Sequence, residues 1–212
     1  RYTEAVEQLG SKEAPVRLGG VYTLVGLVDE WLEEKSLSDD ERFKEGQVII
    51  NNLCAYIRSP LTLKSRMGNL QPEADVRLGI IKEIHDRLQG PEENTPGTWS
   101  DFEYDFSGST FFYPIEFSRV FFNKTADFSG CTYMHEADFG GTIYRNWADF
   151  RGSTYLAHAN FSGSSYHGAA SLNDSVYRST ADFSGNLYLD QANFSGSTYH
   201  DAVTFVDSTY RN

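Results

Sequence analysis

The sequence is poor in basic residues and lacks any long apolar run. Among its 212 residues, 18 are Lys or Arg and 30 are Asp or Glu, giving a formal net charge of −12. Nucleic acids and anionic lipid surfaces attract basic proteins, so this charge argues against direct binding to either. No apolar stretch approaches the roughly 20 residues that a membrane-spanning helix needs, and we therefore expect a soluble chain.

Cysteine is equally scarce. Cys54 and Cys131 are too few for a disulfide framework, and nothing in the sequence indicates secretion. The chain begins at Arg1 and shows no signal-peptide pattern, so we expect it to be a piece of a longer protein. Its expected location is the cytoplasm, or the cytoplasmic face of a membrane if a missing N-terminal segment anchors it.

The composition changes sharply near residue 100. Of the 28 Phe and Tyr residues, 24 follow residue 98, whereas 12 of the 18 Lys and Arg residues precede it. Between these regions lies a polar segment rich in Gly and Pro. The sequence therefore predicts a helical domain over residues 1–89, a linker over 90–99 and a repeat domain over 100–212.

Apolar residues recur at helical spacing in three stretches of the first domain. Helix starts are marked by Pro15, by a capping box that begins at Ser38, and by Pro72. Pro60 and Gly90 are expected to end the second and third helices. The three predicted buried stripes are Leu18, Val21, Val25, Val28 and Leu32; Val48, Ile49, Leu53 and Ile57; and Val76, Ile80, Ile84 and Leu88.

A four-residue segment, Val-Arg-Leu-Gly, occurs at residues 16–19 and again at 76–79. Two copies at this separation are typical of a duplicated helical hairpin of the HEAT or armadillo kind. An unrelated helical bundle that carries a chance match explains them equally well, and both interpretations stay open.

The second domain has a repeat of eleven residues. One position is Phe in nine of ten units, and a second position, five residues later, is aromatic in all ten. Alanine stands two residues before the first position in seven successive units, from Ala126 to Ala192. The two registers are Phe106, Phe117, Phe128, Phe139, Phe150, Phe161, Leu172, Phe183, Phe194 and Phe205; and Phe111, Phe122, Tyr133, Tyr144, Tyr155, Tyr166, Tyr177, Tyr188, Tyr199 and Tyr210.

A fixed short period predicts stacked copies of one backbone shape around a shared interior. A single unit makes too tight a coil to hold one Phe and one Tyr, whereas two successive units make a coil of plausible bore. Ten units then make about five coils, with Ser-Gly pairs supplying turns. We expect the tyrosine hydroxyls to lie near a corner or to bond the small hydroxyl residues beside them.

The runs ADFSG at 181–185 and ANFSG at 192–196 resemble the motif of the pentapeptide-repeat proteins, A(D/N)(L/F)xx, in its 5 + 6 variant. The resemblance covers about residues 100–212. It implies an α+β protein in which a small N-terminal helical domain precedes a right-handed, four-sided β-helix. It also implies a bacterial protein that binds other proteins.

The residue before each first-register position is expected to point outward. It is acidic in six of ten units, and these residues should form two stripes on opposite sides of the rod: Asp105, Glu116, Asp127, Asp138, Asp149 and Asp182. One interpretation is mimicry of duplex DNA, as in family members that protect DNA gyrase. The other is that Asp and Asn are ordinary solvated turn residues.

No residue constellation indicates catalysis or a cofactor. The histidines share no phase of the repeat, and Cys131 occupies an inward slot for a small residue. Zinc would need about four convergent ligands, which the spacing does not offer. We therefore expect no enzyme, no metal and no cofactor.

A solenoid also needs caps, because an open end exposes apolar side chains and strand edges. The helical domain is expected to cap the N-terminal end through Trp99 and Phe102. No helix follows Tyr210, so either the chain continues or the last coil, with Phe205 and Tyr210, stacks on a second copy as an end-to-end dimer. The leading functional hypothesis is a non-catalytic interaction scaffold; the alternative is an acidic DNA mimic that modulates a topoisomerase such as gyrase, and an enzyme comes third.

Overall fold

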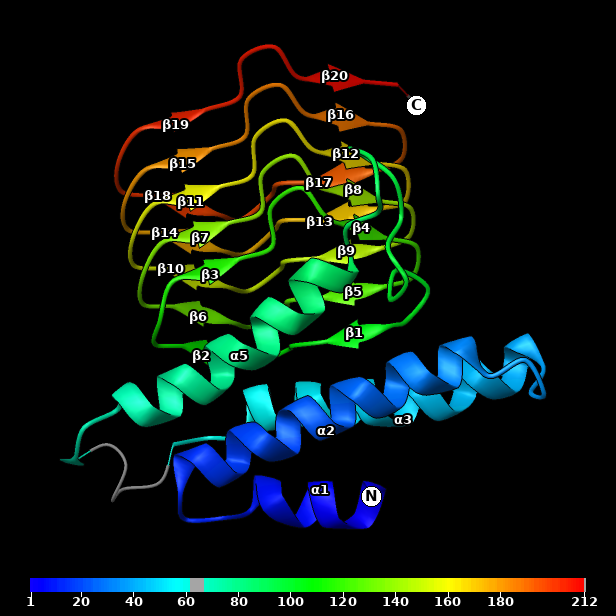
Figure 1. Cartoon of the computed structure of the whole chain (residues 1–212). Helices are drawn as coiled ribbons and strands as arrows, with labels where there is room; N and C mark the ends of the chain where they lie inside the picture. Colours follow the sequence, from blue (N-terminus) through cyan, green and yellow to red (C-terminus); the bar gives the residue numbers. More distant parts are fainter. Residues whose placement is uncertain (62–66, 212) are drawn as a thin grey trace.

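The computed structural model describes residues 1–61 and 67–211. A group of helices at the N-terminal end is followed by a β-solenoid, and the two described ends of the chain lie at opposite ends of the molecule (Figure 1). The helices within the described residues are α1 (Tyr2–Leu9), α2 (Ala14–Glu33), α3 (Asp39–Arg58) and α5 (Gln71–Arg87). The predicted helical domain is thus present. Helix α1 was not predicted, because it has no apolar stripe and its only buried residue is Ala5.

The predicted helix boundaries agree closely with the structure. Pro15 lies in the first turn of α2, and Ser38 caps α3 in a reciprocal box with Glu41. Of the predicted stripe of α2, Val21, Val25 and Val28 are buried, whereas Leu18 and Leu32 are only partly buried. Leu24 and Leu27, which the stripe did not include, are buried as well. In α3 the prediction for Val48 is wrong, since this side chain is largely exposed.

The solenoid consists of two-residue strands arranged in four parallel sheets of five strands each, over the described residues. Consecutive strands belong to successive sheets, so four strands complete one coil. Partners in neighbouring coils are two repeat units apart, as in the pairing of Ala126 with Ala148. The predicted four-sided solenoid of about five coils is therefore confirmed.

The strands that begin with the alanine position form two of the sheets. These are β1 (Tyr104–Asp105), β5 (Ala126–Asp127), β9 (Ala148–Asp149), β13 (Ala170–Ser171) and β17 (Ala192–Asn193); and β3 (Ile115–Glu116), β7 (Ala137–Asp138), β11 (Ala159–Asn160), β15 (Ala181–Asp182) and β19 (Val203–Thr204).

The strands that end at the second aromatic register form the other two. These are β2 (Thr110–Phe111), β6 (Thr132–Tyr133), β10 (Thr154–Tyr155), β14 (Val176–Tyr177) and β18 (Thr198–Tyr199); and β4 (Phe121–Phe122), β8 (Ile143–Tyr144), β12 (Ser165–Tyr166), β16 (Leu187–Tyr188) and β20 (Thr209–Tyr210).

Aromatic rings fill the interior in stacks that run along the solenoid. Phe128 and Phe150 are stacked with centroids 5.2 Å apart, and Tyr133 and Tyr155 with centroids 4.6 Å apart. Each ring covers the one in the coil before it, so a large apolar area leaves water although every strand is short.

The small residues two positions before the second-register aromatics hydrogen-bond to the backbone of the preceding coil and so form a ladder along the solenoid, instead of bonding the tyrosine hydroxyls. Ser153 Oγ donates to the carbonyl of Phe128 (3.1 Å) and accepts from the amide of Cys131 (3.3 Å). Asn186 is the exception, because its side chain donates to the hydroxyl of Tyr188 (3.0 Å). Five buried tyrosine hydroxyls of the second register have no hydrogen-bond partner in the described chain: those of Tyr133, Tyr144, Tyr155, Tyr166 and Tyr177. For these five, the predicted hydrogen bond to a neighbouring small hydroxyl residue is wrong.

One position in every unit has a positive φ. It is glycine in seven units, with φ between 64° and 71°, because glycine, which has no Cβ, adopts the left-handed conformation at little cost. In the other three units it is Arg119, Asp174 or Asp207, with φ of 54°, 57° and 60°. The predicted role of the Ser-Gly pairs in the turns is confirmed.

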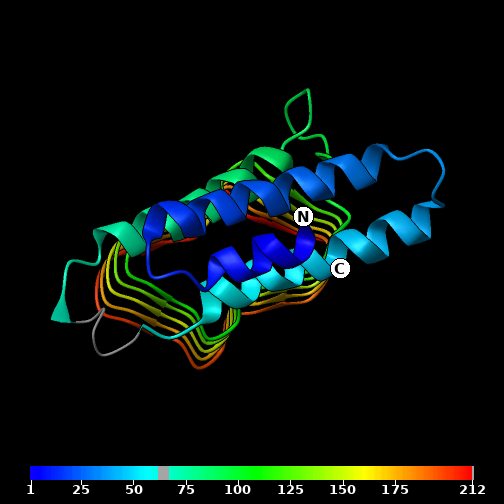
Figure 2. The ribbon, with the colours of Figure 1, turned by 60° about the horizontal axis from the view of Figure 1, so that its bottom comes forward.

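The helices cover the first coil of the solenoid, as seen from that end in Figure 2. α3 contacts β1 and α5 contacts β3. Trp99 and Phe102 are fully buried at this junction; Trp99 Nε1 donates to Asp29 (2.9 Å). The ring of Phe102 lies so close to Gly46 of α3 that a Cβ there would be 2.6 Å from it.

The segment between helices and solenoid is tied to its surroundings. Gln89 and Pro96 form an antiparallel bridge, the amide of Gly90 donates to the carbonyl of Thr95 (2.9 Å), and the amide of Trp99 donates to Arg87 (3.0 Å). These bonds fold residues 90–99 into a compact loop beside the solenoid (Figure 1).

Candidate functional site

The acidic positions of the repeat lie in two columns, which we call the β1 column and the β3 column. Pairing of successive strands aligns the members of each column one coil apart. The β1 column contains Asp105, Asp127, Asp149, Ser171 and Asn193, and the β3 column contains Glu116, Asp138, Asn160, Asp182 and Thr204. The two columns belong to alternate sheets of the four-sided coil, and the structure therefore does not bring all six acidic candidates together.

Most of these side chains shape the turn that follows them. Asp127 Oδ1 accepts from the amide of Ser129, two residues on (2.9 Å), and Asp182 Oδ1 accepts in the same way from Ser184 (2.8 Å). Asn160 makes the same bond to the amide of Ser162 (2.9 Å). Asp and Asn both supply the oxygen that accepts this bond, which explains why they interchange at this position.

Asp149 differs from the rest of its column because it is covered. Its exposure is only 1%. Trp147 donates from Nε1 to Ser171 (3.0 Å), the guanidinium of Arg151 lies over the Trp147 ring, and Arg151 Nε is 3.2 Å from Asp149 Oδ2. Burial raises the pKa of the Asp149 carboxyl, against the opposing influence of the Arg151 amide and guanidinium. Because it is buried, the Asp149 side chain is hardly accessible to a partner.

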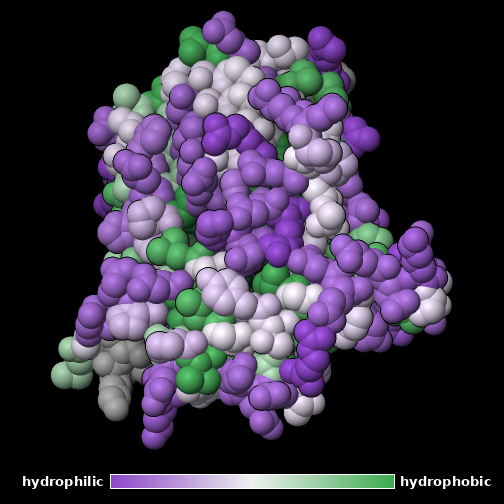
Figure 3. Space-filling model, viewed as in Figure 1, coloured by the Kyte–Doolittle hydropathy of each residue, from purple (hydrophilic) through white to green (hydrophobic). Residues whose placement is uncertain are grey.

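The β3 column runs into a groove between α5 and the solenoid. We call it the α5 groove; it has a volume of about 530 Å³. Its lining residues come from α5 and from the first two coils of that sheet: Leu78, Ile81, Lys82, His85, Asp86, Pro114, Ile115, Glu116, Glu136 and Asp138. Hydrophobic surface at the junction of helices and solenoid, surrounded by hydrophilic surface, is visible in Figure 3.

Charge in the α5 groove is predominantly negative. Four carboxylates line it, those of Asp86, Glu116, Glu136 and Asp138, and among the described residues Lys82 is the one lysine or arginine that does so. Lys82 Nζ is bonded to Asp86 (2.6 Å), and this hydrogen bond lowers the pKa of the Asp86 carboxyl. The other three carboxylates lie on the solenoid wall.

A polar cluster that the sequence reasoning missed lies between α2, α3 and α5. Arg17 and Arg77, the arginines of the repeated four-residue segment, both bind Glu73, each at 2.9 Å. Arg77 is only 3% exposed and also donates to the carbonyls of Ile57 (2.8 Å) and Ser59 (2.9 Å). The repeated segment was the available signal, although it did not reveal that both copies meet at one carboxylate.

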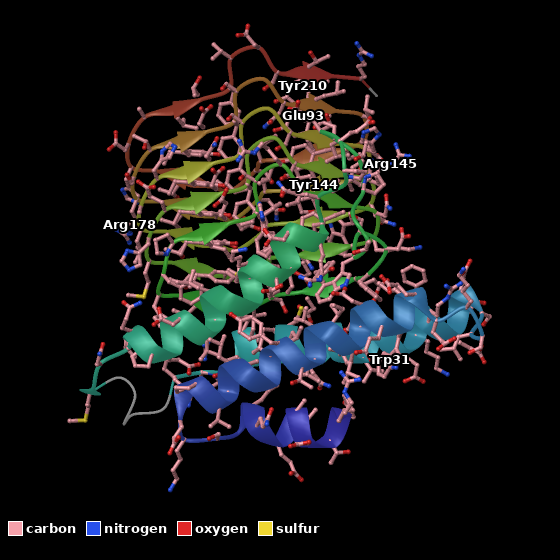
Figure 4. All side chains as sticks on the ribbon, viewed as in Figure 1. Trp31, Glu93, Tyr144, Arg145, Arg178 and Tyr210 are labelled. Atoms are coloured by element: carbon pink, nitrogen blue, oxygen red, sulfur yellow. The ribbon has the colours of Figure 1, made fainter. Side chains whose placement is uncertain are left out.

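The far end of the solenoid is open among the described residues. Phe205 is 38% exposed and Tyr210 is 56% exposed, whereas their counterparts one coil earlier, Phe183 and Tyr188, are buried. Phe205 and Tyr210 still stack on these rings at 5.0 and 4.8 Å. Figure 4 shows Tyr210 on the last coil, far from the helices.

Metal-binding side chains do not cluster in the described part of the chain. No group of three or more His, Cys, Asp or Glu residues there could hold a metal ion. Both cysteines are free and buried, and burial raises each thiol pKa to about 12. Among the helices described, none is long and apolar enough to cross a membrane.

Comparison of the chain with protein-family models, with curated proteins and with solved structures found no match. The architecture is consistent with the pentapeptide-repeat fold that the sequence resembles.

Proposed function

We propose that this protein is a non-catalytic scaffold that binds other proteins through the outer surface of its solenoid and helical cap. One observation carries this proposal: the repeated Ser and Asp side chains that could suggest chemistry are engaged in ladders and turns, as Ser153 and Asp127 are. The fold offers a partner two columns of outward residues, which inter-coil hydrogen bonds hold in place, and the α5 groove, where His85 of α5 bonds the carbonyl of Ser118.

Retrieval and reconstitution of a binary complex test the scaffold. The full chain would be immobilised, a retained protein identified by mass spectrometry, and the pair titrated by calorimetry. A scaffold should form a saturable complex that outward substitutions such as Glu136→Lys or Asp127→Asn weaken by severalfold, while the interior change Tyr155→Phe leaves it intact. If the affinity for the partner changed among the variants only as their stability changed, and did not depend on any outward residue, the proposal would be refuted.

A DNA mimic that modulates a topoisomerase is the second candidate. The observation that favours it is the alignment of Asp105 with Asp127, and of Glu116 with Asp138, about one strand spacing apart. The protein would be titrated into a gyrase supercoiling assay beside the triple variant Asp105→Asn, Asp127→Asn and Asp138→Asn. Inhibition at low micromolar concentration that the triple variant loses supports mimicry; no inhibition, or inhibition that the variant retains, argues against it.

The open end supports a further proposal, an end-to-end dimer in which the coil of Phe205 and Tyr210 stacks on a second copy. Aromatic faces and unpaired strand edges favour such stacking. Light scattering should give twice the chain mass at micromolar concentration, and Phe205→Asp should return it to the monomer value. A monomer mass for the unaltered chain would exclude the dimer.

A further inference from the structure

The α5 groove offers backbone acceptors as well as carboxylates. In the second coil the carbonyls of Glu136 and Asp138 accept from the amides of Ile115 and Phe117, at 3.0 and 2.8 Å. The corresponding carbonyls one coil earlier are those of Glu116, on β3, and of Pro114, which directly precedes β3; this strand lies at the edge of its sheet. Within the described chain neither of these two carbonyls has a hydrogen-bond partner, and both residues line the groove.

α5 already satisfies the next carbonyl of the same edge. His85 Nε2 lies 2.9 Å from the carbonyl oxygen of Ser118, the counterpart of Gly140, which accepts from Arg119 (2.8 Å). His85 thus takes the position that the amide of a preceding coil would occupy if the solenoid continued in this direction. The carbonyls next to Ser118 along β3 face the groove.

The carboxylates around this edge add to its acceptor character. Glu136 has no hydrogen bond or ion pair to its side chain among the described residues. Asp138 Oδ1 accepts from the amide of Gly140 (2.9 Å), and Glu116 Oε1 accepts from Ser118 (2.9 Å), which leaves the second oxygen of each for a ligand. The single lysine, Lys82, is already paired with Asp86.

The floor of the groove is apolar. Ile81 and Ile115 are buried and Leu78 is partly buried beside them, and the volume of about 530 Å³ is in the range of sites that hold a ligand. A suitable occupant is therefore rich in donors and positive charge, and it also carries apolar side chains at alternate positions.

We infer that the α5 groove binds an extended, arginine-containing segment of a partner protein along the part of the β3 edge that lines the groove. The backbone amides of the segment donate to the carbonyls of Pro114 and Glu116, its arginines pair with Glu136 and Asp138, and its apolar side chains contact Leu78 and Ile81. This is strand addition at a sheet edge, combined with charge recognition. The inference rests on the scaffold function proposed above and names the surface and the chemistry of its partner.

A peptide titration on the full chain tests the inference. The probe is a fluorescein-labelled decapeptide of alternating Arg and Leu, with a Glu and Leu peptide as the negative control, at about 0.15 M salt to screen long-range attraction. Binding of the arginine peptide is expected, and Glu136→Lys should weaken it at least 10-fold. Glu93→Lys makes the same charge change in the loop after α5 (Figure 4) and should alter the affinity less than about twofold.

A variant of opposite sign completes the test. Lys82→Glu adds a carboxylate to the rim and should tighten binding severalfold, whereas Lys124→Glu, an equal charge change at a position outside the groove, should not. Equal effects of groove and control variants, or failure of the arginine peptide to bind, would overturn the inference. The scaffold proposal would survive either result, since its own test uses the natural partner and other outward surfaces.

Discussion

Asn160 donates a hydrogen bond from its side-chain amide to Asp138 Oδ1, one coil earlier in the β3 column, over 3.1 Å. The same Asp138 oxygen accepts from the amide of Gly140 (2.9 Å). An amide between the acidic coils of this column replaces repulsion between like charges by a bond. The interchange of Asp and Asn therefore has a role between coils as well as within each turn.

Asn160→Asp is expected to lower the free energy of unfolding at neutral pH by about 1 kcal/mol, because it replaces this bond by two adjacent carboxylates. Asn193→Asp is the matched control, since its partner in the column is Ser171 and no carboxylate precedes it. Urea denaturation measures both. Similar losses in the two variants would show that the charge itself, and not its neighbour, is responsible.

Gly152→Ala isolates the backbone requirement of the turn. Gly152 has a φ of 67°, and a Cβ there would meet no atom within 4 Å. The left-handed conformation should therefore lower stability by about 1 kcal/mol without any clash. Arg119→Gly, at the same position of another unit with a φ of 54°, should raise it by about 0.5–1 kcal/mol. Thermal denaturation of both variants is the measurement, and shifts of the same sign would contradict this explanation.

Ser153→Ala tests the internal ladder. The change leaves a buried carbonyl and a buried amide without their partner, so a loss of about 1–3 kcal/mol is expected. Ser184→Ala is a suitable control, because Ser184 is bonded through its backbone, by its amide to Asp182 and by its carbonyl to Gly163, and alanine keeps both bonds. Guanidinium unfolding would show the ladder to be unimportant if both variants behaved alike.

Asp149→Asn tests the covered carboxylate through its pH dependence. Because burial raises the pKa of Asp149, the folded state binds a proton more readily than the unfolded state, and the ionised form lowers stability. The penalty is absent below the ordinary Asp pKa, about 3.9, and grows as pH rises through the raised value. The stability of Asp149→Asn relative to the unaltered protein should therefore increase from pH 4 to pH 7. A difference that stays constant with pH would contradict the shift.

The two thiols should not react with a disulfide reagent in the native protein. Burial raises the pKa of Cys54 and Cys131 to about 12, so little thiolate exists at pH 8, and access is closed as well. Both should react after denaturation in guanidinium. Rapid native labelling of either cysteine would show that the corresponding domain opens locally.

Much of the fold follows from sequence because the interior is local and periodic. The eleven-residue spacing of Phe and Tyr gives the coil length, the number of coils and the inward positions, and the capping box gives the start of α3. Each of these depends on residues close together in the chain or one period apart, where spacing translates directly into geometry.

The α5 groove could not be predicted in this way. It exists because α5 packs beside β3, and the bond from His85 to Ser118 joins elements that no repeat connects. The cover over Asp149 likewise depends on Trp147 and Arg151, which occur once and not in every unit. The repeat predicts that the Asp149 side chain points outward. Its exposure, however, is determined by Trp147 and Arg151, which do not belong to the repeat pattern.

Strands pair with strands two repeat units further along the chain, and this pairing determines how the solenoid can be lengthened or shortened. Insertion or removal of one whole coil leaves every column, ladder and aromatic stack aligned with itself, and the helical cap is undisturbed. A change of a single unit keeps the same inward pattern but moves each later unit to the opposite side, so that the two columns are exchanged beyond that point. Whole coils alter the reach of the surface; half coils redirect what the far end presents relative to the α5 groove.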